Sequence, residues 1–367
     1  MITISLCMIV KNEEEVLARC LDSVKDYVDE INIVDTGSTD TTVEIAKQYT
    51  DRVFFFEWTG NFAQARNESF KYATQDYILY LDADDVILEE DQQKLAQLKE
   101  TLDPAVDSVS MYYNAGVDAF GNITLRYRRN RLIKRTRNFR WVGDVHNYLQ
   151  VYGNVINSDV AITHKSTEHA VGRNLAIYQR KKERGDTFST RDYFYYGNEL
   201  RENNHLEDAI EAYNQAVAQE TGWVEDKFYA CIFRADCYRS LDKSDQELAS
   251  LLESIRFTKS PRPEASSRIG DYFKRKKEFR HAIVWYELAI AAKPDANQWS
   301  FSYPAYSTWY PHLQLCVCYD MLGDSQKAYY HNEEARSYRP EDPSVIHNQK
   351  YLTKKLGLDS LTTSATD

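Results

Sequence analysis

The sequence predicts an α/β domain with a mostly parallel sheet, followed by an all-helical domain made of repeats. In the first half, apolar runs rich in β-prone residues alternate with stretches of helical periodicity. Such alternation is typical of a parallel sheet, whose right-handed crossovers bring the carboxyl ends of the strands to one edge. From about Gly172 only helical patterns follow, and small and aromatic residues recur in them at roughly the spacing of paired-helix repeats.

Each expected element of the first domain has its own local signal, either an apolar run or an apolar stripe at helical spacing. The expected strands are residues 2–10, 30–34, 52–58, 77–81, 108–114 and 123–133. The expected helices are a segment around residues 16–24 and then residues 41–49, 61–74 and 91–102. Ser38, Thr39 or Asp40 can cap the helix at 41–49, because their side chains accept hydrogen bonds from free helix amides.

The composition limits the classes of function. A chain of 367 residues with 43% hydrophobic residues can form two or three domains. Its net charge of −11 disfavours nucleic-acid binding. The six cysteines have neither paired nor zinc-ligand spacing, which favours a reducing compartment. Because the sequence also has no apolar run of membrane-spanning length and no secretory signal, we expect a soluble, cytoplasmic protein.

The acidic turn after the fourth expected strand is the most informative segment. Asp82 and Asp84 lie two positions apart around a bend, so both can bind one hard cation such as Mg²⁺ or Mn²⁺. Asp35 ends another strand of the same predicted sheet, so it should face the same crevice. The alternative is a pair of unrelated, solvated turns. Since the sequence has neither a GxGxxG nor a Walker motif, a phosphate here would have to be held by a metal and side chains.

Four motifs then carry a family resemblance. They are MIVKNE at residues 8–13, VDTGSTDT at 34–41, ARN at 65–67 and LDADD at 81–85. In order and spacing they resemble the family 2 glycosyltransferases, which have the Rossmann-like GT-A fold. The resemblance implies that Asp35 contacts the base of a nucleotide sugar, that Arg66 lies near its diphosphate, and that Asp84 binds the metal. The implied donor-binding set is Val10, Glu13, Asp35, Arg66, Asp82, Ala83 and Asp84. Lys11 departs from the aromatic residue that many family members have.

The resemblance also implies a reaction. A sugar would move from a UDP-sugar, with UDP-glucose or UDP-N-acetylglucosamine favoured, with inversion at the anomeric carbon. Mn²⁺ or Mg²⁺ would neutralise the leaving diphosphate as a Lewis acid. Arg66 would add a charge-assisted contact, and a base would take the proton of the acceptor.

A second informative segment is residues 141–147. Family members have a G-x-x-H-E motif here, which makes His146 a further candidate metal ligand. Asn147 replaces the usual glutamate, so Asp144 becomes the candidate catalytic base, although a simple turn acid is an equally good interpretation. The basic stretch of residues 126–140 either attracts a diphosphate or an acidic acceptor, or is an exposed strand face.

The second half fits the tetratricopeptide pattern. Repeat anchors fall at Gly197, Ala235, Gly270 and Cys316, and the copy at Gly270 fits best. We expect a longer insertion around residues 297–310 and a capping helix at 345–355. The expected domains are therefore residues 1–168 for the transferase fold, 169–355 for the helical repeats and 356–367 for a polar tail. Stacked repeats can bind peptides, mediate dimerisation or brace the first domain.

The combination of the two domains is similar to bacterial peptide glycosyltransferases of the glycocin type. The resemblance implies a peptide or protein acceptor presented by the repeats. One alternative is a glycan or lipid-glycan acceptor, with the repeats forming a homodimer. Another is a non-catalytic repeat adaptor with a relic transferase domain.

Overall fold

The computed structural model describes residues 1–165, 172–292 and 299–358. The chain divides into two compact units. The first consists of residues 1–117, 123–180 and 297–302, and the second of residues 118–122, 181–296 and 303–367. Two short segments therefore group with the other half of the sequence. These are the tip of a strand hairpin at 118–122 and residues 297–302.

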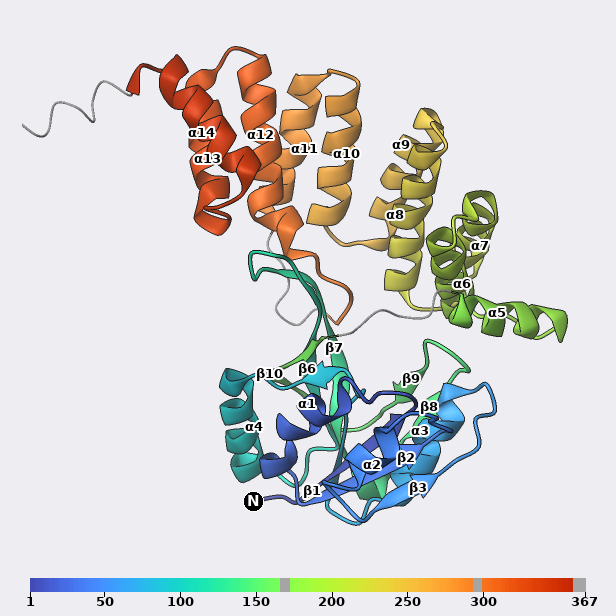
Figure 1. The fold of residues 1–367 in the computed structure, drawn as a ribbon. Helices are drawn as coiled ribbons and strands as arrows, with labels where there is room; N and C mark the ends of the chain where they lie inside the picture. Colours follow the sequence, from blue (N-terminus) through green and yellow to red (C-terminus); the bar gives the residue numbers. More distant parts are fainter. Residues whose placement is uncertain (166–171, 293–298, 359–367) are drawn as a thin grey trace, which may run out of the picture. The chain divides into compact units, whose positions relative to one another are not determined.

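The first unit is organised around an eight-stranded sheet with the order β3-β2-β1-β4-β7-β6-β10-β5 (Figure 1). Its strands are β1 (Ile4–Val10), β2 (Glu30–Asp35), β3 (Val53–Phe55), β4 (Tyr77–Tyr80), β5 (Asp85–Val86), β6 (Ser108–Val117), β7 (Ile123–Lys134) and β10 (Val155–His164). Strands β1 to β4 are parallel, and β10 is parallel to β6. Only β7 and β5 run antiparallel to their partners. The predicted mostly parallel sheet is confirmed.

Helices α1 (Leu17–Asp22), α2 (Thr42–Ala46), α3 (Phe62–Lys71) and α4 (Glu89–Thr101) connect these strands, and β8 (Arg140–Val142) pairs with β9 (Tyr148–Gln150) in a separate hairpin. Strand β1 is buried on both faces. Leu6 packs in one core with Leu17 and Leu21 of α1, while Cys7 packs in another with Tyr80 and other residues. Burial of both faces explains why this strand reads as an almost continuous apolar run.

Some elements are shorter than expected. Strand β3 covers Val53–Phe55 instead of residues 52–58, because it is an edge strand whose pairing ends opposite Asp35 at the end of β2. Helix α2 ends at Ala46. Of the three candidate caps, Asp40 accepts a hydrogen bond from the backbone amide of Thr42 at 3.0 Å.

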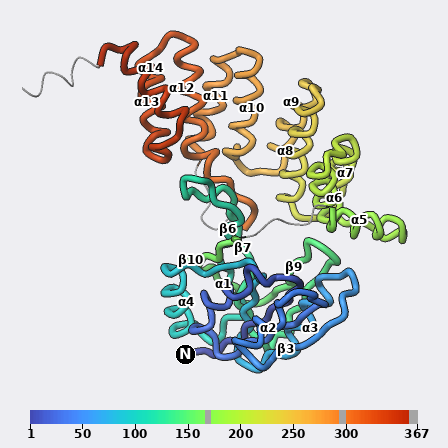
Figure 2. The backbone as a smooth tube through the Cα atoms, viewed as in Figure 1, coloured from blue at the N-terminus to red at the C-terminus, as the bar shows by residue number. Residues whose placement is uncertain are grey.

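The second unit consists of paired helices (Figures 1 and 2). Helix α5 (Arg173–Glu183) crosses the division between the units. The pairs are α6 (Thr190–Glu202) with α7 (Leu206–Ala218), α8 (Val224–Ser240) with α9 (Ser244–Ser254), α10 (Pro263–Arg275) with α11 (Phe279–Ala291), and α12 (Trp309–Met321) with α13 (Ser325–Tyr338), followed by α14 (Pro343–Lys355). Each predicted repeat anchor lies on the first helix of a pair. Among the described helices, none has the length and apolar character needed to cross a membrane.

The two glycine anchors explain the close packing inside a pair. A Cβ atom added to Gly197 would lie 2.6 Å from the ring of Tyr213, and one added to Gly270 would lie 2.7 Å from the ring of Tyr286. Each tyrosine donates a hydrogen bond to the residue that follows its glycine: Tyr213 to Asn198 at 2.8 Å, and Tyr286 to Asp271 at 2.6 Å. The same contact is therefore built twice, in pairs α6/α7 and α10/α11.

Candidate active site

The acidic turn at the carboxyl end of β4 is closed by its own backbone. The amide of Asp85 donates to the carbonyl of Asp82 at 3.0 Å, and the amide of Asp82 donates to Oδ2 of Asp85 at 3.0 Å. Asp85 then begins β5, which pairs with the end of β10 and places Asp85 opposite His164. The pairing brings a histidine from a distant part of the sequence to the acidic turn.

Asp84, Asp85 and His164 form a candidate metal site. Their ligand atoms all lie within 4.8 Å of one another, and no other group of this kind occurs in the described part of the chain. Nδ1 of His164 is 3.3 Å from Oδ1 of Asp84 and 3.7 Å from Oδ1 of Asp85. Oδ1 of Asp85 is buried and has no hydrogen-bond partner among the described residues. A buried carboxylate oxygen that accepts no hydrogen bond, next to a second carboxylate, fits a divalent cation such as Mg²⁺ or Mn²⁺.

The charge balance at this site also points to a cation. Burial alone would lower the pKa of His164, but the neighbouring carboxylates of Asp84 and Asp85 raise it to about 9. The pKa of Glu13 is raised to about 7, mainly by burial, with smaller contributions from Asp84 and Asp82. Protons thus take up negative charge that a metal ion would otherwise neutralise, and metal binding would release them.

Asp82 is held by arginines. Arg66 lies 2.5 Å from its Oδ1, and Arg129 of β7 lies 3.6 Å from its Oδ2. Burial by itself would raise the pKa of Asp82, but Arg66, Arg131 and Arg129 together lower it well below its usual range. The guanidinium of Arg66 also lies over the ring of Trp141, 4.7 Å from its centre. In this structure Arg66 therefore pairs with the first aspartate of the predicted metal motif.

Arg131 stabilises the acidic turn through contacts with Asp85 and Tyr80. Its side chain and that of Asp85 are both 0% exposed, and Nη2 of Arg131 lies 3.0 Å from Oδ2 of Asp85. Nη1 of Arg131 donates to the carbonyl oxygen of Tyr80 at 3.0 Å. The interpretation of the basic stretch as an exposed strand face is therefore wrong for Arg131, and also for Arg128, which is buried. These side chains point inward because β7 lies between β4 and β6.

The loops after β1 and β2 lie side by side. Asp35 is buried, and its carboxylate accepts hydrogen bonds from the amides of Gly37 and Ser38. Asn12, in a left-handed conformation with φ of 54°, accepts from the amide of Thr39 at 2.8 Å. Val10 is the register partner of Asp35. Val10 is buried, as is Ala83 in the acidic turn.

The two candidates from residues 141–147 have other contacts. Oδ1 of Asp144 accepts from the side-chain amide of Asn61 at 2.5 Å, and the Asp144 carbonyl accepts from the amide of Phe62. The ring of His146 stacks near that of Tyr178, with centres 6.3 Å apart. The structure brings His164 to Asp84, and His146 is not part of that group. The roles of Asp144 as base and His146 as metal ligand stay predictions.

Sequence reasoning missed Asp85, His164 and Arg131. The signal for His164 was present, because it comes two positions after the apolar run at residues 160–162 and ends its strand, as Asp35 ends β2. No local pattern predicts the pairing of Asp85 with Arg131. It depends on the position of β7 beside β4 in the sheet.

Comparison with known proteins agrees with this geometry. Residues 5–157 match the family model described as Glycosyl transferase family 2. This segment is a family 2 glycosyltransferase domain. The chain is 38% identical over 103 residues to the SPbeta prophage-derived glycosyltransferase SunS of Bacillus subtilis, covering 28% of this chain and 24% of that protein. It is 48% identical over 88 residues to the TPR repeat-containing protein Synpcc7942_0270 of Synechococcus elongatus, covering 24% and 22%.

The chain thus spans about a quarter of the length of these relatives or less. Among solved structures, the chain is similar to YrrB, described as a TPR protein with an unusual peptide-binding site. The TM-score is 0.37 at 17% identity, covering 49% of this chain and 84% of that one. A likeness at this level carries no argument about function.

Proposed function

We propose that the protein is a metal-dependent, inverting glycosyltransferase that moves a sugar from a UDP-sugar to a peptide or protein side chain. The observation that supports this most is the candidate metal group of Asp84, Asp85 and His164 at the carboxyl edge of a family 2 domain. Ligands bind at this edge in open α/β sheets. UDP-glucose and UDP-N-acetylglucosamine are the favoured donors.

Mn²⁺ or Mg²⁺ would be held by Asp84, Asp85 and His164, and would neutralise charge on the leaving diphosphate. Arg66 and Arg129 add positive charge at the same turn, and both are within 3.6 Å of Asp82. Asp35, at the end of the neighbouring β2, would contact the base of the donor, with Glu13 nearby. Asp144 is the proposed base that takes the proton of the acceptor, because Asn147 stands where the family usually has glutamate and carries no carboxylate.

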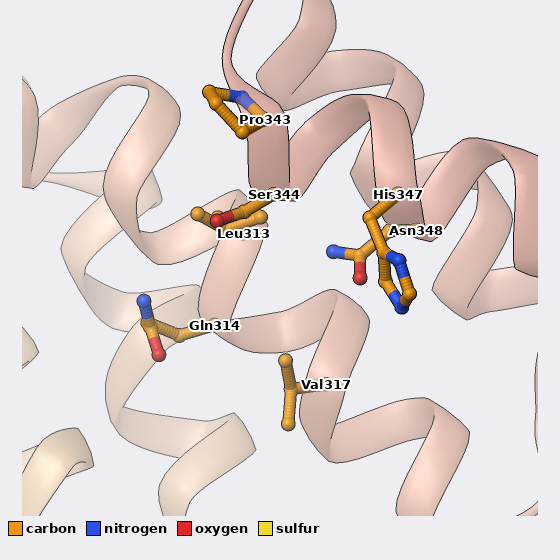
Figure 3. A pocket seen from close by; sticks show the side chains of 7 residues that line it. All are labelled: Leu313, Gln314, Val317, Pro343, Ser344, His347 and Asn348. Carbon is orange, nitrogen blue, oxygen red and sulfur yellow. The ribbon is translucent and has the colours of Figure 1, made fainter.

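The repeats supply surfaces for a peptide acceptor. A pocket of about 500 Å³ opens between α12 and α14 (Figure 3). Leu313, Val317 and Pro343 give it apolar walls, and the polar ends of His347 and Asn348 line it as well. Its volume and mixed lining suit one or two side chains of an extended peptide.

The first test is hydrolysis of UDP-glucose and UDP-N-acetylglucosamine by the full chain, with and without Mn²⁺. We expect slow, metal-stimulated hydrolysis that Asp84→Asn abolishes and that Asp51→Asn, at an exposed position outside the acidic turn, leaves unchanged. Incubation with candidate peptides and donor, followed by mass spectrometry, then tests the acceptor. Absence of both nucleotide binding and turnover would favour the relic adaptor, and modification of glycans with no peptide product would overturn the peptide acceptor.

A further inference from the structure

A second concentration of charge lies entirely within the helical unit, around Asp236 of α8. Arg268 of α10 approaches this carboxylate with two nitrogens, Nε at 3.4 Å and Nη2 at 3.3 Å. Arg239 of α8 lies 3.3 Å from Oδ1, and Arg201 of α6 lies 4.0 Å from Oδ2. The three arginines come from the first helices of three successive pairs. They converge on one acid, which is the only carboxylate within 4.0 Å of them in the described part of the chain.

The cluster has more donors than acceptors. Nε of Arg201 and Nη1 of Arg268 are buried and have no hydrogen-bond partner among the described residues. Arg201 lies over the ring of Phe233 at 4.3 Å, and Arg268 over that of Tyr306 at 4.8 Å. The aromatic rings hold the guanidinium planes without neutralising them. Three positive charges against one negative charge leave the cluster with capacity for a further anion.

Other ion pairs of the same unit have a smaller imbalance of charge. Arg262 lies between two carboxylates, those of Glu225 and Glu264. Glu253 pairs with two arginines, Arg234 at 2.5 Å and Arg256 at 3.2 Å. A contact that only holds repeats together would be expected to have little excess charge, since an excess of buried charge is costly. The arginine cluster around Asp236 departs from that pattern.

We propose that Arg201, Arg239 and Arg268 form a binding site for a carboxylate side chain of the acceptor, so that the protein selects acidic peptide segments. This proposal rests on the proposed peptide acceptor. Arg239 is 45% exposed and Arg201 is 27% exposed, so an incoming group can reach them. Guanidinium groups bind carboxylates through paired, charge-assisted hydrogen bonds. Asp236 then acts as an internal competitor that holds the arginines in place until the ligand arrives.

The test uses the full chain and a short fluorescent peptide rich in glutamate, with a glutamine-for-glutamate peptide as its neutral match. We expect the acidic peptide to bind more tightly than the neutral one, with an affinity that falls as salt is raised. Arg201→Gln and Arg239→Gln should each weaken binding about three- to tenfold. Arg256→Gln is the matched control, because Arg256 is 72% exposed and pairs with Glu253 outside the cluster. It should bind as the unchanged protein does.

Asp236→Asn separates a binding site from a structural clamp. If Asp236 competes with the ligand, this variant should bind the acidic peptide several-fold more tightly. Equal binding of the two peptides, or Arg239→Gln binding with unchanged affinity, would overturn the proposal, and Arg239 is exposed enough for that variant to fold. Binding of inorganic phosphate without binding of the acidic peptide would overturn it as well. Hydrolysis of UDP-sugar is measured separately, so failure of the arginine site and failure of the proposed transferase activity can be distinguished.

Discussion

The two charge clusters of this protein differ in their proportion of acids to arginines. At the acidic turn, Asp82, Asp84, Asp85 and Glu13 face Arg66, Arg129 and Arg131, and a raised pKa on His164 and Glu13 adds protons to the balance. Around Asp236, three arginines face a single acid. The first arrangement favours a cation and the second favours an anion. The proportion of acids to arginines in each cluster, rather than the presence of ion pairs, is what indicates a ligand.

The comparison also concerns stability. In the sheet unit a buried pair, Asp85 with Arg131, includes one residue of the candidate metal site. In the helical unit the partners around Asp236 remain partly exposed. Loss of a partner should therefore be far more costly in the first unit than in the second, because a buried charge without its partner retains its full desolvation penalty.

The largest effect should come from Arg131→Met. Removing this guanidinium leaves the carboxylate of Asp85 buried without compensation, and we expect the free energy of unfolding to fall by about 3–5 kcal/mol. Chemical denaturation of the sheet unit measures it. Lys71→Met, at an exposed position that pairs with Glu68, should change stability by less than about 1 kcal/mol. A loss of similar size in both variants would contradict a special role for the buried pair.

Metal binding gives the next largest effect. Mn²⁺ at about one hundred times its dissociation constant should stabilise the protein by about 2.7 kcal/mol, seen as a rise in the thermal midpoint. Asp84→Asn and His164→Gln should abolish that rise, because they remove donor atoms of the candidate group.

His146→Gln sharpens the same experiment. If His146 completes the metal shell, as the resemblance implies, this variant should lose the Mn²⁺ response as fully as His164→Gln does. If His164 is the histidine ligand, His146→Gln should keep most of the response. A stabilisation by Mn²⁺ that survives in both histidine variants would place the ion elsewhere.

A smaller effect is expected from the glycine contacts of the helical unit. Gly197→Ala should destabilise it by about 1–3 kcal/mol, since the new Cβ would lie 2.6 Å from the Tyr213 ring. In a Tyr213→Ala background the same change should cost nothing further, because alanine favours a helix over glycine. Unfolding midpoints of the four proteins measure the coupling. An equal loss in both backgrounds would show that the glycine is needed for another reason.

The smallest effect concerns a pair of neighbouring histidines in the helical unit. Nδ1 of His312 lies 3.0 Å from Nδ1 of His331, and burial, with His312 and Lys327 adding to it, lowers the pKa of His331 to about 4. The unfolded chain therefore takes up a proton at higher pH than the folded one. Stability should fall as pH drops from about 6.5 to about 4, by about 1–2 kcal/mol after discounting for partial exposure.

His331→Gln should flatten that pH dependence, measured as the free energy of unfolding at several pH values. His281→Gln, at a position that is 68% exposed, serves as the control and should keep the slope. A slope that is the same in all three proteins would assign the pH dependence to other groups.

Much of the architecture could be predicted from local patterns. The strand ending at the acidic turn, the parallel arrangement of β1 to β4 and the helix pairs anchored at Gly197 and Gly270 all depend on periodicity and turn chemistry, which neighbouring residues determine. Element boundaries were less predictable. Strand β3 ends early because its only partner ends at Asp35, and that limit belongs to the sheet and not to the strand.

By itself, the sequence determined which residues could serve a cation: acids placed where β-strands stop, at one edge of a sheet. Only the tertiary structure decided which of them share a site. His164 meets Asp84 because β10 pairs with β5, Arg131 meets Asp85 because β7 lies beside β4, and Asp236 meets arginines of three helix pairs through repeat stacking. Periodicity is a property of adjacent residues, whereas charge balance in a buried cluster depends on residues that only folding brings together.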